Sequence, residues 1–443
     1  MKRPILFGAL SVTLLSALSG CASQAPVPVE DSSPVAASVS DGEAVEAKTV
    51  SASKTVAAPA AIIRSEGVPD GVKSPLGLTV PRGFEISVFA DNLDRPRRLT
   101  FAPGASAGRY DVFVAEPFAN RVSVLRVQNS QVRSKSVFTS ALNQPYGLAF
   151  GAGSFYVANT DSVVRFPFKT GSVKATSAPQ KIADLTEGGY NQHWTRNLLF
   201  SRDQKKLFVT VGSSCNTCEE DDPQRAAVSV MNPDGSGKKL FATGLRNPVG
   251  LAWKPDSNDL YTVVNERDNL GDDVPPDYLT SVKAGAFYGW PYAYTDINRQ
   301  IFLDPNFGAK APQMAKKTVA PDVPVQAHSA ALGVAFYPTK GGNFPANYSG
   351  DAFLAFHGSW NRSAKTGYKI VRVDFQNGQP RTVSDFVTGY LTGNGNAWGR
   401  PVDVQIAPDG SLLFSDDDGR KIWRVAYKGN KSSASSKPSA GSS

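Results

Sequence analysis

Cysteine and histidine are scarce in this sequence, with three of each among 443 residues. Cys-x-x-Cys-His, the attachment signature of c-type haem, does not occur, so a covalently attached haem is excluded. No run of Lys and Arg is interleaved with aromatic residues, which excludes a nucleic-acid-binding stripe. The formal net charge is +8, from 47 basic and 39 acidic residues, and this mild excess suits a small anion or an acidic surface.

The apolar run near the N-terminus, Ile5 to Leu18, is too short to span a bilayer. Two basic residues precede it and small residues follow, which predicts a signal peptide over residues 1–20. The sequence Leu-Ser-Gly-Cys resembles a bacterial lipobox, so Cys21 is the predicted lipidation site; the alternative is an isolated thiol near a cleavage site. Ala22 stands where an acidic retention signal would, so we expect a periplasmic protein anchored by lipid to the outer membrane.

Aromatic residues are absent from residues 21–70, where Ala, Ser, Val, Pro and Glu predominate. Such a composition buries too little apolar surface to order itself, so this stretch, with the anchor at its start, is a predicted disordered tether. Residues 428–443 are also of low complexity and are predicted to be a disordered tail. The folded domain is therefore expected over residues 71–427.

Six segments of the folded domain share one pattern, in which a short apolar strand, a turn and a second strand follow one another. The first strands are predicted at 98–101, 147–150, 197–200, 250–253, 333–336 and 403–406, and the second at 111–115, 154–158, 206–210, 259–263, 352–355 and 411–414. The first three intervals are about 50 residues, the size of a propeller blade, and the last two contain an insertion. The pattern predicts an all-β fold, a six-bladed β-propeller; the alternative is a pair of β-sandwiches with coincidental spacing.

One segment, Phe84–Ala90, matches the segments that end the other repeats but stands before the first repeat. It has no blade of its own. We predict that this N-terminal strand closes the last blade by pairing with Lys421–Val425, which removes the exposed sheet edges that invite aggregation.

Residues just before the first strands are expected to surround the axis of the propeller, where ligands of this architecture usually bind. Counting back from the repeats gives a ring of Arg95, Gln144, His193 with Trp194, Arg246 with Asn247, Ala330 and Arg400, with His328 close by. Each residue alone is more often structural, as a buried histidine or a loop arginine. Their convergence favours a site for an anionic ligand with a potential base.

Four segments carry a resemblance to a known family: 191–200 with its Asn-Gln-His-Trp, 244–253 with Gly-Leu-Arg-Asn-Pro, 285–291 with Tyr-Gly-Trp-Pro, and 356–362 with Phe-His-Gly-Ser-Trp-Asn-Arg. These segments resemble the glucose/sorbosone dehydrogenases, which include soluble quinoprotein sugar dehydrogenases and fungal pyranose dehydrogenases. The similarity covers essentially all of residues 71–427. It implies a six-bladed propeller that oxidises a small sugar with pyrroloquinoline quinone (PQQ) and Ca²⁺ and passes electrons to an external acceptor.

The resemblance also implies roles for single residues. His193 matches the catalytic histidine, and a neutral imidazole is a suitable base for a sugar hydroxyl. Guanidinium groups bind carboxylates, and the quinone is a tricarboxylate. The implied cofactor-binding residues are Arg246, Asn247, Arg400, Gln144 and Arg362, the last beside Asn361, which replaces a family lysine.

Calcium prefers oxygen ligands. The family resemblance places its ligands in the loop 265–273 and points to Asp268 and Asn269. The alternative for the neighbouring Asp272 and Asp273 is that they cap a turn or bind a structural ion. The acidic stretch 415–420 lacks the downstream glutamate of an EF-hand and is read as a blade turn.

Cys215 and Cys218 stand in a Cys-x-x-Cys sequence on a predicted loop. A redox-active pair is one interpretation. No thioredoxin-like βαβ pattern surrounds it, so a local structural disulfide is the favoured one.

Three functions remain open from the sequence. The first is a PQQ-dependent aldose, pyranose or sorbosone-like sugar dehydrogenase. The second is a non-catalytic, envelope-tethered propeller that binds glycan or protein. The third, a propeller lactonase, needs a carboxylate-rich calcium site at the axis, and the predicted ring is basic instead.

Overall fold

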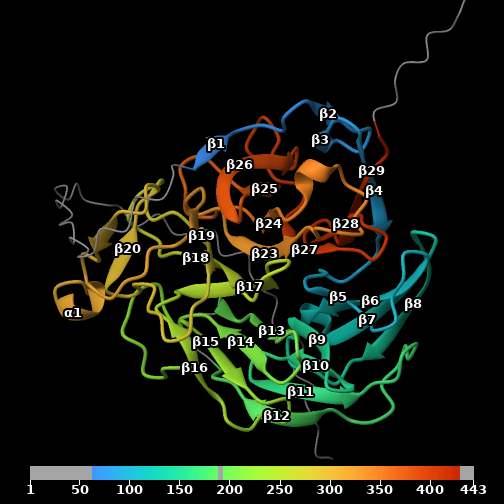
Figure 1. Ribbon diagram of the computed structural model, residues 1–443, viewed down its shortest axis with the longest axis horizontal. Helices are drawn as coiled ribbons and strands as arrows, with labels where there is room; N and C mark the ends of the chain where they lie inside the picture. The colour runs from blue at the N-terminus through green and yellow to red at the C-terminus, as the bar shows by residue number, and fades with distance from the viewer. Residues whose placement is uncertain (1–61, 188–192, 430–443) are drawn as a thin grey trace, which may run out of the picture. The chain divides into compact units, whose positions relative to one another are not determined.

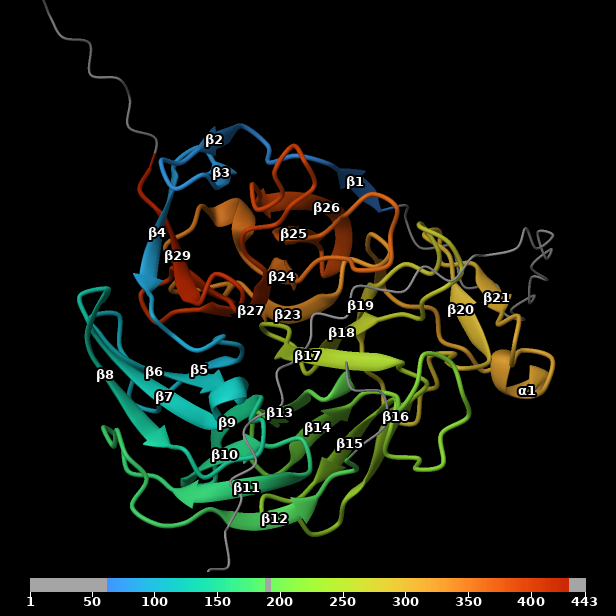
Figure 2. The ribbon, with the colours of Figure 1, turned by 180° about the vertical axis from the view of Figure 1, so that it is seen from behind.

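The structure, a computed structural model, describes residues 62–187 and 193–429, all within one compact unit. Six antiparallel sheets of four strands follow one another around an axis, and one of them gains a fifth strand at its edge (Figures 1 and 2). The predicted six-bladed β-propeller is confirmed. No helix in these two ranges is long and apolar enough to cross a membrane.

The blades are numbered in chain order of their innermost strands. The strands of the first three, from the axis outwards, are β5 (Leu99–Phe101), β6 (Arg109–Glu116), β7 (Arg121–Gln128) and β8 (Gln131–Thr139); β9 (Gly147–Gly151), β10 (Ser154–Ala158), β11 (Ser162–Pro167) and β12 (Gln180–Asp184); β13 (Arg196–Phe200), β14 (Leu207–Val211), β15 (Ala227–Met231) and β16 (Lys239–Thr243). Those of the last three are β17 (Asn247–Trp253), β18 (Leu260–Asn265), β19 (Tyr278–Ser281) and β22 (Val323–Pro324); β23 (Ala331–Phe336), β24 (Ala352–Phe356), β25 (Lys369–Gln376) and β26 (Gln379–Val387); β27 (Pro401–Ile406), β28 (Leu412–Asp416), β29 (Lys421–Tyr427) and β4 (Phe84–Ala90).

All six predicted pairs of first and second strands occur, with bounds shifted by a few residues at most. The predicted closure occurs too, since β4 pairs antiparallel with β29, with Phe84 opposite Tyr427 and Ile86 opposite Val425. The long interval between β17 and β23 is explained by an insertion before β22. It contains the hairpin β20 (Ala293–Thr295) and β21 (Ile301–Leu303) and the short helix α1 (Pro312–Ala315).

Residues shortly before the propeller are also ordered into strands. Strand β1 (Ile63–Ser65) pairs parallel with the outer strand of blade 5, β26, and Arg64 donates to the carbonyl of Pro324 at 2.8 Å. β2 (Gly71–Lys73) and β3 (Thr79–Pro81) form a hairpin. The sequence placed Ile63–Ser65 in the tether, because three exposed residues that pair through their backbone leave no hydrophobic pattern.

Apolar side chains between the blades form the core. Six buried clusters each draw their residues from two neighbouring blades. Successive side chains of a strand point to opposite faces of its sheet, so one strand serves two clusters. In β6, Val112 belongs to the cluster shared with blade 6, whereas Phe113 belongs to the one shared with blade 2, where its ring lies 4.9 Å from that of Phe155.

The innermost strands approach one another closely around the axis. A Cβ atom on Gly147 of β9 would lie 2.6 Å from the carbonyl oxygen of Arg196 in β13, and one on Gly333 of β23 would lie 2.7 Å from that of Val402 in β27. Such distances are below van der Waals contact. Glycine therefore allows the backbones of neighbouring blades to touch. Tyr146, Val249, Leu332 and Val402, which lie in or next to the innermost strands, form a further buried cluster.

The substitution Gly333→Ala is expected to destabilise the protein by about 1 to 3 kcal/mol, because the added methyl group overlaps backbone atoms of the next blade, which cannot rotate away. Gly393→Ala is the matched control, since a Cβ there meets nothing within 4 Å. Denaturant unfolding of the two variants measures the effect. Equal stabilities would show that blade spacing does not depend on this glycine.

Candidate functional site

The predicted ring residues lie on one face of the propeller. In an antiparallel sheet the chain reverses at every strand, so the connection before the innermost strand and the connection between the second and third strands emerge on the same side. His193 precedes β13, Arg246 and Asn247 stand at the start of β17, and Arg400 precedes β27. Facing them are the connections that follow β14, β18, β24 and β28.

His193 is buried, with 5% of its surface exposed, and its Nδ1 lies 3.0 Å from the carbonyl oxygen and 2.9 Å from the hydroxyl of Ser213. That hydroxyl donates to the carbonyl of Cys215 at 2.7 Å, so it accepts from the ring. A carbonyl only accepts, and Nδ1 must therefore carry the proton. Burial, and then the positive charge of Arg246, lowers the pKa of His193 well below its ordinary value. The imidazole is neutral near pH 7, with its lone pair on Nε2.

Arg246 is buried and donates all five of its guanidinium hydrogens within the protein. Nε donates to the carbonyl oxygen of Asn216 at 3.0 Å, and Nη2 to its side-chain oxygen at 2.9 Å. Nη2 also pairs with Asp268 at 3.2 Å, and Nη1 donates to the carbonyls of Asn265 and Glu266. The guanidinium is thus fixed by the fold.

Asn247 and Asn361 each present a buried side-chain oxygen that accepts no hydrogen bond. Their amide groups are held from the other side: Asn247 Nδ2 donates to Asn265 at 3.2 Å, and Asn361 Nδ2 donates to Asp268 at 2.8 Å. Buried acceptors without a donor are costly, so both positions suit a donor group of a ligand.

Asp268, a predicted calcium ligand, is surrounded by donors. One carboxylate oxygen accepts from Asn361 and the other pairs with Arg246. His328 Nδ1 lies 3.7 Å away, and the backbone carbonyl accepts from Asn216 and from the neighbouring arginine. Oxygens already occupied by cationic and amide donors do not fit a calcium ion. Asn269 is exposed, with a left-handed backbone at φ 70°.

Arg400 holds the connection that follows β24. Its Nε and Nη2 donate to the carbonyl oxygens of His357 and Gly358, each at 3.1 Å. His357 Nε2 lies 3.0 Å from Asp417. Burial, and then the charge of Arg400, lowers the pKa of His357 to about 4. Among the ion pairs of the described ranges, none involves Arg400.

Arg97 connects this group with His193. It pairs with Asp417 at 2.7 Å, and its guanidinium carbon lies 5.2 Å from the ring centre of Trp194, the neighbour of His193 in the chain. Residues from four blades thus form one continuous chain of contacts. This chain includes Trp194 and Arg400 of the predicted ring, whereas Arg95 is exposed and lies over the ring of Phe118 at 4.8 Å.

Gln144 and Arg362 lie at the margin. Gln144 is exposed, and its side-chain oxygen accepts from Thr160 at 3.4 Å. Arg362 pairs with Asp273 at 2.8 Å and donates to the carbonyl of Asp272, which ties the connection after β24 to the one after β18.

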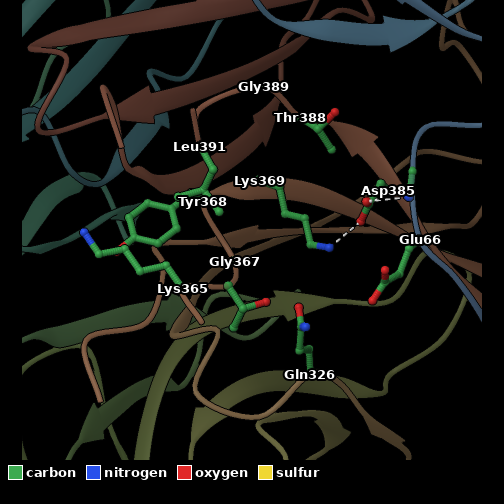
Figure 3. A pocket seen from close by; sticks show the side chains of 12 residues that line it. Glu66, Gln326, Lys365, Gly367, Tyr368, Lys369, Asp385, Thr388, Gly389 and Leu391 are labelled. Atoms are coloured by element: carbon green, nitrogen blue, oxygen red, sulfur yellow. Dashed lines mark hydrogen bonds and ion pairs between the residues drawn. The ribbon is translucent and has the colours of Figure 1, made fainter. Parts of the chain in front are cut away.

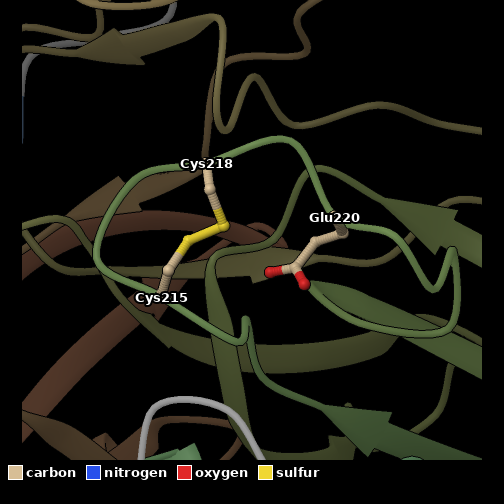
Figure 4. Close-up of side chains that lie close together, drawn as sticks. All are labelled: Cys215, Cys218 and Glu220. Atoms are coloured by element: carbon tan, nitrogen blue, oxygen red, sulfur yellow. A yellow bond between two sulfur atoms is a disulfide. The ribbon is translucent and has the colours of Figure 1, made fainter.

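Cys215 and Cys218 form a disulfide in the connection that follows β14 (Figure 4). Together with Glu220 they are the one group of at least three His, Cys, Asp or Glu residues in 62–187 and 193–429 whose ligand atoms are close enough to share an ion. The disulfide occupies both sulfurs. Cys21, the predicted lipidation site, lies outside the described residues.

A model of the TrAA12-like family matches residues 78–428. The chain belongs to the TrAA12-like family. An uncharacterized protein of Borreliella burgdorferi is 31% identical over 79% of this chain and 91% of its own. A pyrroloquinoline quinone-dependent sugar dehydrogenase of Hypocrea jecorina is 25% identical over 77% of this chain and 87% of its own.

Solved structures agree on the fold of this TrAA12-like chain. The holo form of the PQQ domain of pyranose dehydrogenase from Coprinopsis cinerea matches 82% of this chain and 100% of that domain, with a TM-score of 0.68 and 21% identity. The family match over residues 78–428, not this structural likeness, confirms the predicted membership of a PQQ sugar dehydrogenase-like propeller family.

Sequence reasoning missed three residues that organise the TrAA12-like site: Ser213, Asn216 and Asp417. All three lie in connections after second strands, whereas the sequence count went back only from first strands. Counting forward from the predicted second strands 206–210 and 411–414 would have found them, since polar residues follow both strands within a few positions.

A cavity of about 440 Å³ adjoins the ring beside β25 (Figure 3). Lys369 and Asp385 pair in it at 2.7 Å, and Asp385 accepts from the backbone N–H of Gly67 at 2.9 Å. Tyr368 lines the cavity and has Arg400 over its ring at 5.5 Å. None of the predicted site residues lines the cavity, so it borders the site without being part of it.

The substitution His357→Gln is expected to weaken the acid dependence of stability. Histidine in an unfolded chain has a pKa of about 6.5, and in the folded protein the pKa of His357 is about 4. The unfolded state therefore binds an extra proton between these values, and the free energy of unfolding falls by about 3 kcal/mol as the pH falls through them. Denaturant unfolding at about pH 7 and pH 4 measures the change. The same loss in both proteins would contradict the assignment.

Proposed function

We propose that this TrAA12-like protein is a PQQ-dependent dehydrogenase that oxidises an aldose, pyranose or sorbosone-like sugar and passes the electrons to an external acceptor. The single observation that carries the proposal is His193, a buried neutral imidazole whose proton is fixed on Nδ1. The family relationship supports it, because the related protein of Hypocrea jecorina bears the name of a PQQ-dependent sugar dehydrogenase.

Oxidation of a sugar alcohol carbon requires a base that removes the proton from its hydroxyl group. The quinone, when bound, supplies the acceptor for the hydride of that carbon. Nε2 of His193 receives the hydroxyl proton, and Ser213 stabilises the resulting imidazolium through the carbonyl and hydroxyl that already face Nδ1. Burial keeps bulk water away from this proton.

The residues around the axis fit an anionic quinone in part. Arg400 carries a positive charge that no carboxylate within the described ranges neutralises through an ion pair, so it suits a carboxylate of the cofactor. The unsatisfied oxygens of Asn247 and Asn361 would accept from a donor group of the quinone or of the sugar. Arg246 contributes its positive charge and not a new hydrogen bond, since its five hydrogens are engaged.

The test of the proposal is reconstitution. Apoprotein is incubated with PQQ and Ca²⁺, quinone absorbance is recorded after gel filtration, and dye reduction is assayed with a panel of sugars. In His193→Ala we expect bound quinone to be retained and turnover to fall about 10²-fold to 10⁴-fold, because the base is lost and the anion contacts are not. Absence of bound quinone in the wild type, or full turnover in the variant, would contradict the proposal. Glycan binding without turnover would favour a non-catalytic propeller.

We also propose that Cys21 carries the lipid that holds the protein at the periplasmic side of the outer membrane, on the strength of the Leu-Ser-Gly-Cys sequence. Cys21→Ala is expected to shift the protein from the membrane fraction to the soluble fraction of cells. Cys215→Ala with Cys218→Ala is the matched control, which removes the other two cysteines without touching the anchor. Retention of the Cys21→Ala protein in membranes would refute the anchor.

A further inference from the structure

The connection that follows β14 contacts both the Arg246–Asp268 ion pair and His193. It begins at Gly212 and contains the disulfide between Cys215 and Cys218, which encloses Asn216 in a short ring (Figure 4). Both cysteines are partly exposed. A covalent cross-link between residues three apart limits the conformations open to the residues between them.

Asn216 makes five hydrogen bonds from this ring. Its backbone carbonyl accepts from Arg246 Nε at 3.0 Å and from the indole of Trp290 at 3.2 Å. Its side-chain oxygen accepts from Arg246 Nη2 at 2.9 Å and from the backbone N–H of Asp268 at 2.8 Å. Its amide donates to the carbonyl of Asp268 at 3.3 Å. One residue therefore aligns the guanidinium and the carboxylate that pair beside the axis.

The disulfide-closed loop also contacts His193, the proposed base, through Ser213. The carbonyl of Cys215 accepts from the hydroxyl of Ser213, which turns the hydroxyl oxygen toward His193 Nδ1. The carbonyl of Ser213 accepts from the same nitrogen. Both acceptors that face Nδ1 belong to Ser213, so a change in the backbone of this connection would move them away from the ring together.

We propose that the Cys215–Cys218 disulfide holds two positioning groups before any ligand arrives: Asn216, which fixes Arg246, and the carbonyl of Cys215, which through Ser213 fixes the tautomer of His193. The proposal rests on the proposed function for its relevance to catalysis. The positioning of Arg246 and His193 itself involves only groups of the protein and can be tested without cofactor or substrate. Groups fixed in advance need not be ordered during binding, so affinity for an anion at Arg246 gains from the cross-link.

The first experiment reads the tautomer of His193 in apoprotein by ¹⁵N NMR of the imidazoles, which is simple because the chain has three histidines. Wild type is expected to show the Nδ1–H form. Dithiothreitol breaks the S–S bond, leaves two thiols on the protein and is itself oxidised to a cyclic disulfide. After this reduction, or in Cys215→Ser with Cys218→Ser, we expect a mixture of tautomers. An unchanged Nδ1–H signal in folded, reduced protein would overturn the link to His193.

The second experiment measures the dissociation constant of PQQ by titration of apoprotein. Asn216→Ala is expected to weaken binding about tenfold, because one buried Nη2 hydrogen of Arg246 and the backbone N–H of Asp268 lose their acceptor, while the tautomer of His193 stays that of the wild type. The disulfide variant is expected to change both readouts. Asn232→Ala is the matched control, an asparagine of the same blade whose amide donates to Ser236 in an exposed turn.

The outcomes separate the two proposals. Wild-type protein that binds no quinone refutes the proposed function, and the NMR experiment still decides whether the disulfide positions His193. If the wild type, Asn216→Ala and the disulfide variant all bind quinone with the same dissociation constant, the positioning role is refuted. Thermal unfolding of each variant accompanies the titration, and reduction of folded wild type replaces any variant that does not fold.

Discussion

The close approach of the innermost strands is the constraint on which the rest of the structure depends. Where Gly147 and Gly333 face the backbone of the next blade, there is no room for a methyl group. This spacing sets the distance between neighbouring sheets, and the interblade clusters then fill it with side chains from both faces of every strand. It also brings the starts of the innermost strands near the axis, so residues from distant parts of the chain share one small volume.

Buried charge in that volume is arranged in pairs. Arg97 is paired with Asp417, and Arg246 with Asp268. A buried cation without a partner is costly, and the fold satisfies these two with carboxylates from the connections after second strands. Arg400 donates to carbonyl oxygens instead and forms no ion pair among the described residues. The site is consequently rigid and still attractive to an anion.

Much of the fold was predictable because it repeats. The six pairs of strands and the closure by β4 follow from apolar alternation at regular intervals, a signal that survives without any knowledge of contacts. The ring positions of His193, Arg246 and Arg400 followed from the same repeat. Their partners did not, because a residue such as Asn216 acts through hydrogen bonds to chain segments far away in the sequence. Polar loop residues have no periodicity that reveals this.

The sequence also could not distinguish a guanidinium that binds a ligand from one whose hydrogens all bond to groups of the protein. Arg246 looked like a carboxylate-binding residue by type and position, yet its hydrogens are all engaged within the protein. Its influence on the site is electrostatic. It contributes, after burial, to the lowered pKa of His193, which keeps the imidazole unprotonated near neutral pH. An anion beside Arg246 would cancel part of that positive field and so raise the pKa of the His193 imidazole.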